Sequence, residues 1–455
     1  LKETEEDCCT LDTPVHIHAV PFIFAIGVTI ALIIEINLLP LVFTKGVVSD
    51  HELCTALCEK VLQDGGSSVD AAIVGALCLG IVHPHVSGVG GGGVMLVHNA
   101  RQNRTKVINF QGRSICGSSR DALGVAPLSW NNIISRAADL AREGFNFMLE
   151  NFNPLTLDTF IPDGQALRFG SYIRRPDLAE VLETGVRYFY QGEISVFHTK
   201  VQANGGVLNR EDIRNYSVEV QQPLESQYNE HIIKVPPLPS AGAVLIAALN
   251  LLETLHLWEN DVTENQTSRW IDAKQWCAKY NQSMDLIFPS KGQAAGLQQR
   301  MKDVLQLLYA SNSTIHPFLT EQLTGQVVIM GPDDLIVSVA SSLNRPFGSR
   351  IMTESGIILN SLILDFFWPN QRSGLLESNQ NNVLEPGKRP LTFLMPAVMV
   401  PTWNKCGTYM ALSSSGGTNR LNEVTKVCSD LKGQVSKVEV LSPSKVGHAF
   451  LFQPP

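Results

Sequence analysis

Two apolar runs in the C-terminal part of the chain predict a pair of strands. Residues 327–330 and 335–340 are rich in β-branched side chains, and the turn residues at 331–334 (Gly-Pro-Asp-Asp) separate them. A turn of this composition between two such runs is typical of paired strands. Thr324 stands at the head of this stretch, and Asn344 closes it.

Other segments predict helices first and strands later along the chain. We expect a helix at residues 51–62, ended by Asp64, Gly65 and Gly66, and an alanine-rich helix at residues 69–79 that Ser67 and Ser68 cap. Further helices are expected at residues 130–143, 176–183 and 244–255, and strands at 94–97, 107–110 and 228–235. Strands are expected to dominate from residue 327 to about residue 410. This order predicts a layered α/β domain.

Residues 19–43 are apolar apart from Glu35 and Asn37, and a stretch of this length can span a bilayer. A secretory signal peptide would have a positive leader, whereas the leader here is acidic. We therefore expect a retained transmembrane signal anchor. Residues 1–18 would be a short cytoplasmic tail, and the body would be extracellular or luminal in a single-pass, type II membrane protein. The alternative is a buried core helix.

Composition and charge narrow the function classes. The net charge of −8 argues against nucleic-acid binding. The nine cysteines form no repeated CxxC pairs, so we expect no zinc, no other metal and no cofactor. Cys54 and Cys58 lie four apart in an expected helix, a spacing that leaves their role open. Glycosylation sequons follow the apolar stretch and suit an extracellular body: Asn103, Asn215, Asn265, Asn281 and Asn312.

Four consecutive glycines, at residues 90–93, come directly before an expected strand. A phosphate-binding loop would end in Gly-Lys-Ser/Thr and lead into a helix, so nucleotide binding is the weaker interpretation. We expect these glycines to permit close backbone packing or positive φ angles.

Thr324 has the position that an N-terminal-nucleophile hydrolase requires, at the start of a strand. In such an enzyme the threonine hydroxyl attacks a carbonyl, and the α-amine freed by self-cleavage acts as the base. Most threonines that lead a strand only form turns, so the pattern by itself leaves both interpretations open.

Several stretches together resemble the γ-glutamyltransferase family. The segment GSSVDAAIVGALCLGIVHPHVSGVGGGGVMLVHN resembles its glycine-rich N-terminal signature, and RRPDLAEVL, GGVLNREDIRNYSVEV and PPLPSAGAVLIAALNLLE follow in the family's order. SSLNRPFGSRI, SGIILNSLILDF, KRPLTFLMPAVMV and SSSGGTN continue the match, which covers most of residues 46–430. The resemblance implies a four-layer αββα N-terminal-nucleophile hydrolase sandwich. It also implies self-cleavage into a large chain (residues 44–323) and a small chain (residues 324–455), together a heterodimer.

The resemblance also implies the chemistry and the site. Thr324 would attack the γ-glutamyl carbonyl of glutathione, and water or an acceptor amine would resolve the acyl-enzyme. Ser342 would support the nucleophile, and the backbone N–H groups of Gly416 and Gly417 would form the oxyanion hole. Asn344 and Asp365 would hold the α-ammonium group of the substrate.

Several site positions depart from the family pattern. Gln111 replaces the arginine that binds the substrate α-carboxylate, and glutamine supplies neither a charge nor a guanidinium fork. Arg113 lies two residues on, hence on the same strand face, and is either a substitute for that arginine or a solvated surface residue. Other replacements are Leu362 for a second acid, Thr392 and Phe393 for paired serines, and Gly325 and Gln326 for a hydroxyl residue and a histidine.

Two interpretations of the function therefore stay open. The chain is either an enzyme that cleaves the γ-glutamyl bond of glutathione, or a catalytically silent relative that acts as a membrane-anchored binding or regulatory protein. Two family segments are also shortened, between about residues 114 and 128 and after Cys428.

Overall fold

The structure is a computed structural model of the 455-residue chain. It describes residue 29 and residues 46–111, 128–147, 167–188, 194–209, 211–212, 216–254, 323–366, 382–402, 409–413 and 449–452. All of these except Thr29 belong to one compact unit, Phe43–Pro455. In the ranges just given, no helix is both long enough and apolar enough to cross a membrane. The anchor expected at residues 19–43 lies outside the described residues, apart from Thr29.

The larger sheet has six antiparallel strands in the order β1-β9-β10-β2-β3-β6. Their bounds are Gly46–Ser49 (β1), Leu323–Met330 (β9), Leu335–Asn344 (β10), Gly92–Asn99 (β2), Arg104–Asn109 (β3) and Glu219–Gln221 (β6). The central pair, β9 and β10, is the hairpin predicted from the two apolar runs. Both strands extend further than predicted, so Thr324 becomes the second residue of β9 and Asn344 the last residue of β10.

The smaller sheet is also antiparallel, in the order β13-β12-β11-β8-β7. Its strands are Ala449–Phe452 (β13), Tyr409–Leu412 (β12), Ala397–Pro401 (β11), His231–Val235 (β8) and Leu224–Tyr228 (β7). The two sheets contact each other through β10, since the Ser338 hydroxyl donates to the Leu412 carbonyl at 2.6 Å. Segments from both sides of residue 323 therefore contribute strands to both sheets.

Helices cover the outer faces of the two sheets. Helix α3 (Ser68–Val82) packs on β9 and β10 and is buried along its whole length, as expected of a helix apolar all round. Helices α2 (Glu52–Gln63) and α5 (Trp130–Glu143) pack on α3, and α6 (Pro176–Tyr188) packs on α5. Helix α9 (Gly242–Thr254) packs on β7 and β8 of the smaller sheet.

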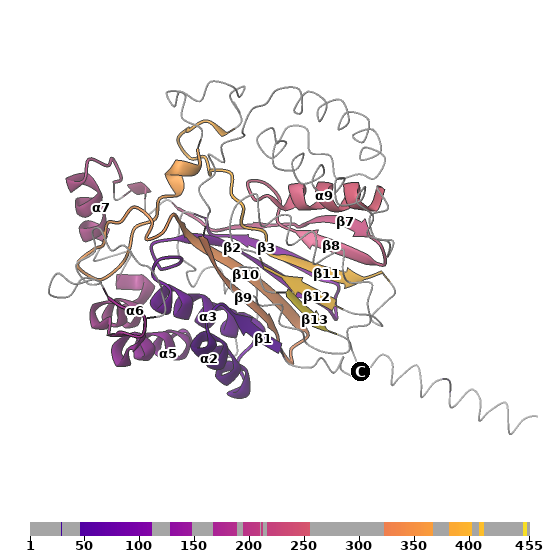
Figure 1. Cartoon of the computed structure of the whole chain (residues 1–455), viewed down its shortest axis with the longest axis horizontal. Coiled ribbons are helices and arrows are strands. Elements are labelled where there is room, and N and C mark those ends of the chain that lie inside the picture. The colour runs from indigo at the N-terminus through magenta and orange to yellow at the C-terminus, as the bar shows by residue number, and fades with distance from the viewer. Residues whose placement is uncertain are drawn as a thin grey trace, which may run out of the picture. The chain divides into compact units, whose positions relative to one another are not determined.

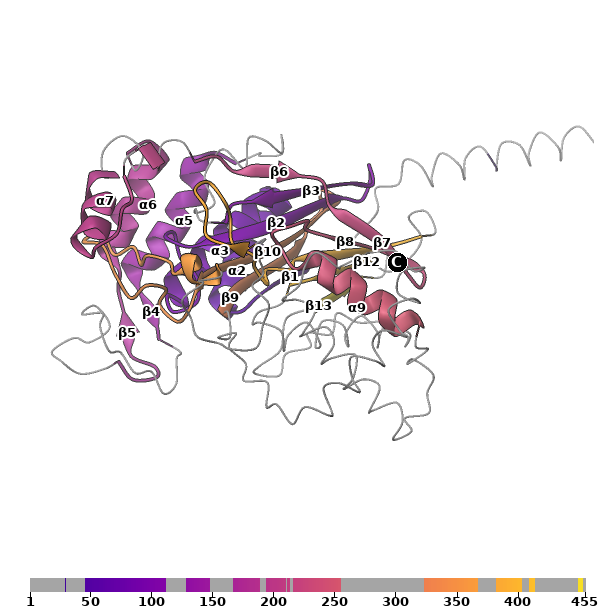
Figure 2. The same cartoon turned by 90° about the horizontal axis from the view of Figure 1, so that it is seen from above.

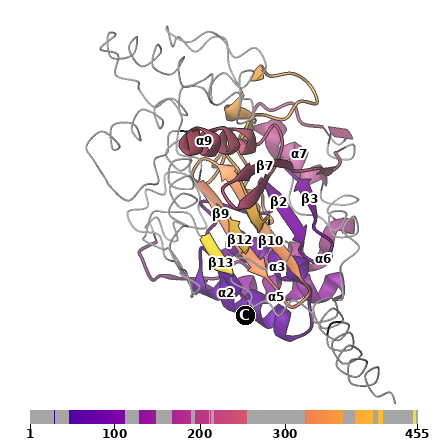
Figure 3. The same cartoon turned by 90° about the vertical axis from the view of Figure 1, so that its right-hand side faces the viewer.

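The figures show the resulting layers of helix, sheet, sheet and helix. In Figure 1, α2, α3 and α5 lie together beside the strands of the larger sheet. Figure 2 shows α9 running alongside β7 and β8. Figure 3 shows the strands between α9 and the helices α2 and α5. The layered α/β prediction is confirmed for the described part of the chain.

Some expected elements differ from those observed. Residues 228–235 are not one strand, because Asn229 takes a positive φ of 51° and turns the chain between β7 and β8. Strands do not dominate after β10, since irregular backbone and one short 3₁₀ helix, η5 (Leu362–Asp365), fill the described residues up to β11. Helix α7 (Ile194–Ala203) was not predicted. Two short strands, β4 (Phe145–Asn146) and β5 (Tyr172–Ile173), pair with each other.

A disulfide settles part of the cysteine question. Cys54 on α2 is bonded to Cys78 on α3, with a Cα–Cα distance of 5.5 Å. Cys58, one helical turn from Cys54, is a free buried thiol that donates to the Ala71 carbonyl at 3.1 Å. The disulfide thus links α3, which packs on β9, to α2, which packs on β1.

Candidate active site

Thr324 lies where the two sheets face each other. Val327 on the same strand contacts helix α3, because a Cβ added to Gly75 would be 3.0 Å from its side chain. Alternation along a strand then directs Thr324 and Gln326 toward the smaller sheet. Both residues are buried, with Thr324 4% exposed. The register of β9 and β10 shifts between Ser341 and Asn344, and this bulge is opposite Thr324. Bulges often re-aim side chains next to active sites.

Ser342 joins the residue before Thr324 to the end of β10. Its hydroxyl donates to the carbonyl oxygen of Leu323, and it accepts from the backbone N–H of Asn344 at 2.8 Å. Ser342 has no solvent exposure. The carbonyl of the Leu323–Thr324 peptide bond is therefore held by a hydroxyl donor.

Asn344 and Asp365 form a polar pair next to this bond. Asn344 has a positive φ of 78°, which asparagine tolerates better than most residues, and its Nδ2 donates to the Ser361 carbonyl at 2.9 Å. Its side chain also hydrogen-bonds the Asp365 carboxyl. Burial raises the pKa of Asp365 to about 7, while the bond from Asn344 and the charge of Arg345 oppose that rise. The pair thus presents a carboxyl that a bound cation would ionise.

Gln111 and Thr392 are two positions that depart from the family pattern: Gln111 contacts the segment around Pro390, and Thr392 lies in it. Gln111 follows β3, is 1% exposed, and donates from Nε2 to the Pro390 carbonyl at 3.2 Å. Thr392, two residues further on, donates its N–H to the Pro239 carbonyl at 2.9 Å and is buried. The N–H of Leu391 donates to Asn382, whose Nδ2 donates to the Asp365 carbonyl at 2.7 Å. A chain of contacts therefore connects Gln111 with Asp365.

Other predicted site residues lie outside the described part of the chain. They are Arg113, the glycines Gly416 and Gly417, and the sequon residues Asn215, Asn265, Asn281 and Asn312. Their roles stay predictions. Asn103 is described, and it is exposed at the turn between β2 and β3. The changed neighbours Gln326 and Leu362 are both buried.

A histidine cluster at the start of α2 and the end of α3 was not anticipated from the sequence. The rings of His51 and His83 lie 5.2 Å apart, and those of His83 and His85 lie 5.4 Å apart. Asp50 accepts from the N–H of Gln326 at 2.7 Å, which connects this region to the candidate nucleophile strand. Burial lowers the pKa of His83 to about 3 and that of His85 to about 4, so both rings are neutral at pH 7. The sequence His83-Pro84-His85 was the feature from which this cluster could have been predicted.

The glycine run provides close backbone packing. A Cβ added to Gly90 would overlap the Ile358 carbonyl oxygen, and one added to Gly93 would lie 2.5 Å from that of Ala340. The backbone of the run therefore lies directly against β10 and the segment that follows it. This is the packing expected from the sequence.

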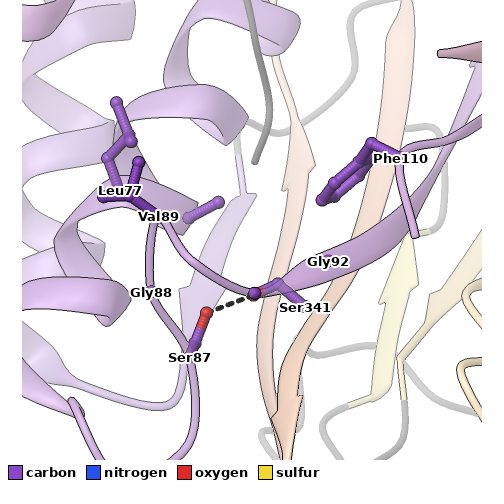
Figure 4. A pocket seen from close by; sticks show the side chains of 9 residues that line it. Leu77, Ser87, Gly88, Val89, Gly92, Phe110 and Ser341 are labelled. Carbon is purple, nitrogen blue, oxygen red and sulfur yellow. Dashed lines mark hydrogen bonds between the residues drawn. The ribbon is translucent and has the colours of Figure 1, made fainter. Parts of the chain in front are cut away.

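A small cavity lies beside this run, with room for about one water molecule. The hydroxyls of Ser87 and Ser341 in its wall are 2.7 Å apart and hydrogen-bonded, as Figure 4 shows. Leu77 of α3 also lines it. The cavity is thus on the helix-facing side of the larger sheet, whereas Thr324 faces the other sheet, and it is not the substrate site.

Comparisons with known proteins agree with this geometry. The model of the family described as gamma-glutamyltranspeptidase matches residues 54–124 and 121–432. Glutathione hydrolase 7 of Rattus norvegicus is 38% identical over 467 residues, covering 89% of this chain and 70% of the relative. The Homo sapiens protein of the same name is 38% identical over 464 residues, with the same coverage.

Solved structures show the fold. Cephalosporin acylase from Bacillus halodurans matches with a TM-score of 0.65 and 20% identity, covering 86% of this chain and 81% of the acylase. At this identity the likeness concerns the fold alone. It is the mixed α/β fold of N-terminal-nucleophile hydrolases, as the sequence resemblance implied.

Proposed function

Because this chain belongs to the gamma-glutamyltranspeptidase family, we propose that it cleaves the γ-glutamyl bond of glutathione and related compounds, with Thr324 as nucleophile. The observation that supports this most directly is the hydrogen bond from the Ser342 hydroxyl to the Leu323 carbonyl. That carbonyl belongs to the bond that must break before Thr324 gains a free amine.

Self-cleavage begins with attack of Thr324 Oγ on the Leu323 carbonyl carbon. Ser342 stabilises the negative charge that develops on the carbonyl oxygen. The carbon–nitrogen bond breaks, the threonine nitrogen takes the hydroxyl proton, and an ester to Oγ remains. Water hydrolyses this ester, which leaves a carboxylate on Leu323 and a free α-amine on Thr324. The product is a heterodimer of large and small chains.

The same hydroxyl then performs acyl transfer. The Thr324 amine takes the proton from Oγ as it attacks the γ-glutamyl carbonyl, and cysteinylglycine leaves with that proton. Water or an acceptor amine resolves the γ-glutamyl ester. Asn344 and Asp365 bind the α-ammonium group of the donor, and Thr392 lines the same site. The backbone N–H groups of Gly416 and Gly417 are proposed as the oxyanion hole.

A denaturing gel and a chromogenic assay test this proposal. The purified protein should show a break before Thr324 and release the aniline from a γ-glutamyl anilide. Thr324→Ala should give one intact band and no release. A single intact band with no release from the wild-type protein would refute the proposed function and leave a silent binding protein.

The body of the protein is proposed to be extracellular or luminal, anchored by residues 19–43. Two observations support this. The sequon residue Asn103 is exposed, and Cys54 and Cys78 form a disulfide, a bond that persists mainly in oxidising compartments. Removal of N-glycans by a glycosidase should increase the gel mobility of the wild-type protein more than that of Asn103→Gln. An equal shift of the two proteins would remove Asn103 as a glycosylation site.

A further inference from the structure

Asn382 joins two segments of the candidate donor site, and both ends of its side-chain amide are engaged. Its Nδ2 donates to the backbone carbonyl of Asp365 at 2.7 Å, and its Oδ1 accepts from the backbone N–H of Leu391 at 3.1 Å. A backbone carbonyl can only accept and a backbone N–H can only donate, so the amide has one orientation. Asn382 is 9% exposed, and loss of these bonds would leave polar groups unpaired in a buried place.

The segment that contains Leu391 is itself held against the rest of the fold. The carbonyl of Pro390 accepts from Gln111 Nε2 at 3.2 Å, at the end of β3. The N–H of Thr392 donates to the Pro239 carbonyl at 2.9 Å, in the turn that precedes α9. This side of the amide bridge is therefore a fixed point.

The segment that ends in Asp365 has little packing of its own. Helix η5 has four residues, and a 3₁₀ helix of this length has few internal hydrogen bonds. Among its apolar side chains Leu362 is buried, whereas Ile363 and Leu364 are 51% and 43% exposed. The position of η5 thus depends mainly on polar contacts.

Hydrogen bonds hold η5 at both ends. At the N-terminal end, the N–H of Ser361 donates to the Leu343 carbonyl at 3.0 Å, and the Ser361 carbonyl accepts from Asn344 Nδ2 at 2.9 Å. At the C-terminal end the last carbonyls of a helix lack a partner within the helix, and Asn382 supplies one to Asp365. Loss of this bond would release the end that carries the carboxyl, while the other end would stay attached to β10.

We propose that Asn382 is a positioning residue of the donor site, which fixes the backbone of Asp365 so that its carboxyl lies where the donor α-ammonium group binds. Asn382 acts through Asp365 and needs no contact with the donor. The inference rests on the proposed function in one respect, because it takes Asp365 as the ammonium-binding group. Thr324 and Ser342 lie on β9 and β10, which Asn382 does not hold. The effect of Asn382 should therefore fall on the donor KM and not on kcat.

Asn382→Leu removes both hydrogen bonds at similar side-chain volume. With a γ-glutamyl anilide it should raise the donor KM about fivefold or more and change kcat by less than about twofold, after normal self-cleavage. Asn250→Leu is the matched control, because Asn250 is a buried asparagine of α9 that accepts from Ser226 of β7 at 3.4 Å. It should lower the melting temperature and leave the donor KM within about twofold of the wild-type value.

A double-mutant cycle with Asp365→Asn separates positioning from a general loss of structure. Once the carboxyl is absent, Asn382→Leu should raise the donor KM by less than about twofold. An unchanged KM in the single variant would overturn the inference, as would an equal fold-increase in the two backgrounds. Asn382→Ala removes the same two bonds without a bulky apolar group. It takes the place of Asn382→Leu if the leucine variant does not fold, with the same expected and contrary results.

The pH dependence of stability gives a readout that needs no turnover. In the uncleaved Thr324→Ala protein, burial of the Asp365 carboxyl should make stability fall as pH rises from 3.8 through about 7. Measured against matched proteins that carry Asp365→Asn, this fall should be smaller with Asn382→Leu, because a released carboxyl gains solvent and its pKa drops. An undiminished fall would overturn the inference.

The two proposals fail in different ways. A wild-type protein that neither self-cleaves nor releases an anilide would refute the proposed function, and the pH dependence of stability would still decide whether Asn382 fixes Asp365. A wild-type protein that turns over, with no KM effect of Asn382→Leu, would refute the role of Asn382 alone.

Discussion

Asp365→Asn should make the protein more stable at alkaline pH while weakening donor binding. The wild-type carboxyl has a pKa raised to about 7, mainly because burial disfavours its charge. Asparagine keeps the shape and an acceptor for the side chain of Asn344, but it carries no charge. The substitution therefore separates two effects of the buried carboxylate: its destabilisation of the fold and its contribution to binding the donor.

The magnitude follows from the raised pKa. Between the ordinary pKa of 3.8 and about 7 the native state keeps a proton that the unfolded state has lost, so stability falls as pH rises through this window. A window of about 3 pH units, at roughly 1.36 kcal/mol for each unit, means that the buried carboxylate lowers the free energy of unfolding by at most about 4 kcal/mol. Asp365 keeps partial exposure, which reduces this effect. We therefore expect Asp365→Asn to be more stable than the wild-type protein by roughly 2 kcal/mol at pH 8, and by almost nothing at pH 4.

Urea unfolding at about pH 4 and pH 8 measures this, in a Thr324→Ala background that keeps the chain in one piece. The stability difference between the protein with the native Asp365 and the Asp365→Asn variant should grow with pH in favour of the variant. In the cleaved enzyme, Asp365→Asn should raise the donor KM by about tenfold or more, because the ammonium loses its counter-charge. A stability difference that is the same at both pH values would refute the reasoning.

Three further predictions concern the frame of the site. Ser342→Ala should slow the appearance of the two chains on a gel by about 100-fold, because the Leu323 carbonyl loses its donor, whereas Ser341→Ala, whose hydroxyl bonds Ser87, should cleave normally. Equal rates would exclude that role for Ser342. Asp333→Ala should lower the free energy of unfolding by about 1–2 kcal/mol, since Asp333 in the β9–β10 turn accepts from the N–H of Ser68 at 2.8 Å; an unchanged urea midpoint would contradict this. Gly90→Ala should prevent folding or lower the melting temperature sharply, because the new Cβ would overlap the Ile358 carbonyl oxygen. Gly88→Ala is the control: its new Cβ would come no closer than 4.0 Å to the Gly80 carbonyl oxygen, so this variant should melt near the wild-type temperature.

Local signals predicted the elements that local chemistry determines. Helix α5 has the predicted bounds, since Ser129 accepts from the N–H of Asn132 at one end and Gly144 turns the chain at the other. The cap of α3 by Ser67 was also predicted. The turn between β7 and β8 was missed because Asn229 and Glu230 supply the reversal without a glycine or proline.

The site was predictable in part. The hairpin alone brings Thr324 and Asn344 to the same end of two paired strands, so their proximity follows from sequence spacing. The bond from Gln111 to Pro390 joins residues 279 positions apart, and no local pattern encodes it. The same holds for buried Arg175, which donates to carbonyls of Gly80 and Gly356 from a distant helix end. Such contacts depend on how the layers pack.

The position of the β9–β10 hairpin between β1 and β2 affects whether the cleaved protein can refold. A break before Thr324 would leave this hairpin inside a sheet whose strands on both sides, β1 and β2, belong to the other fragment. Neither fragment alone would contain a complete core. The two fragments folded as one continuous chain, and after cleavage they could not fold that way again. The stability of the mature protein would then be kinetic: it would depend on a slow rate of unfolding and not on a reversible equilibrium. A molecule that unfolded would not refold.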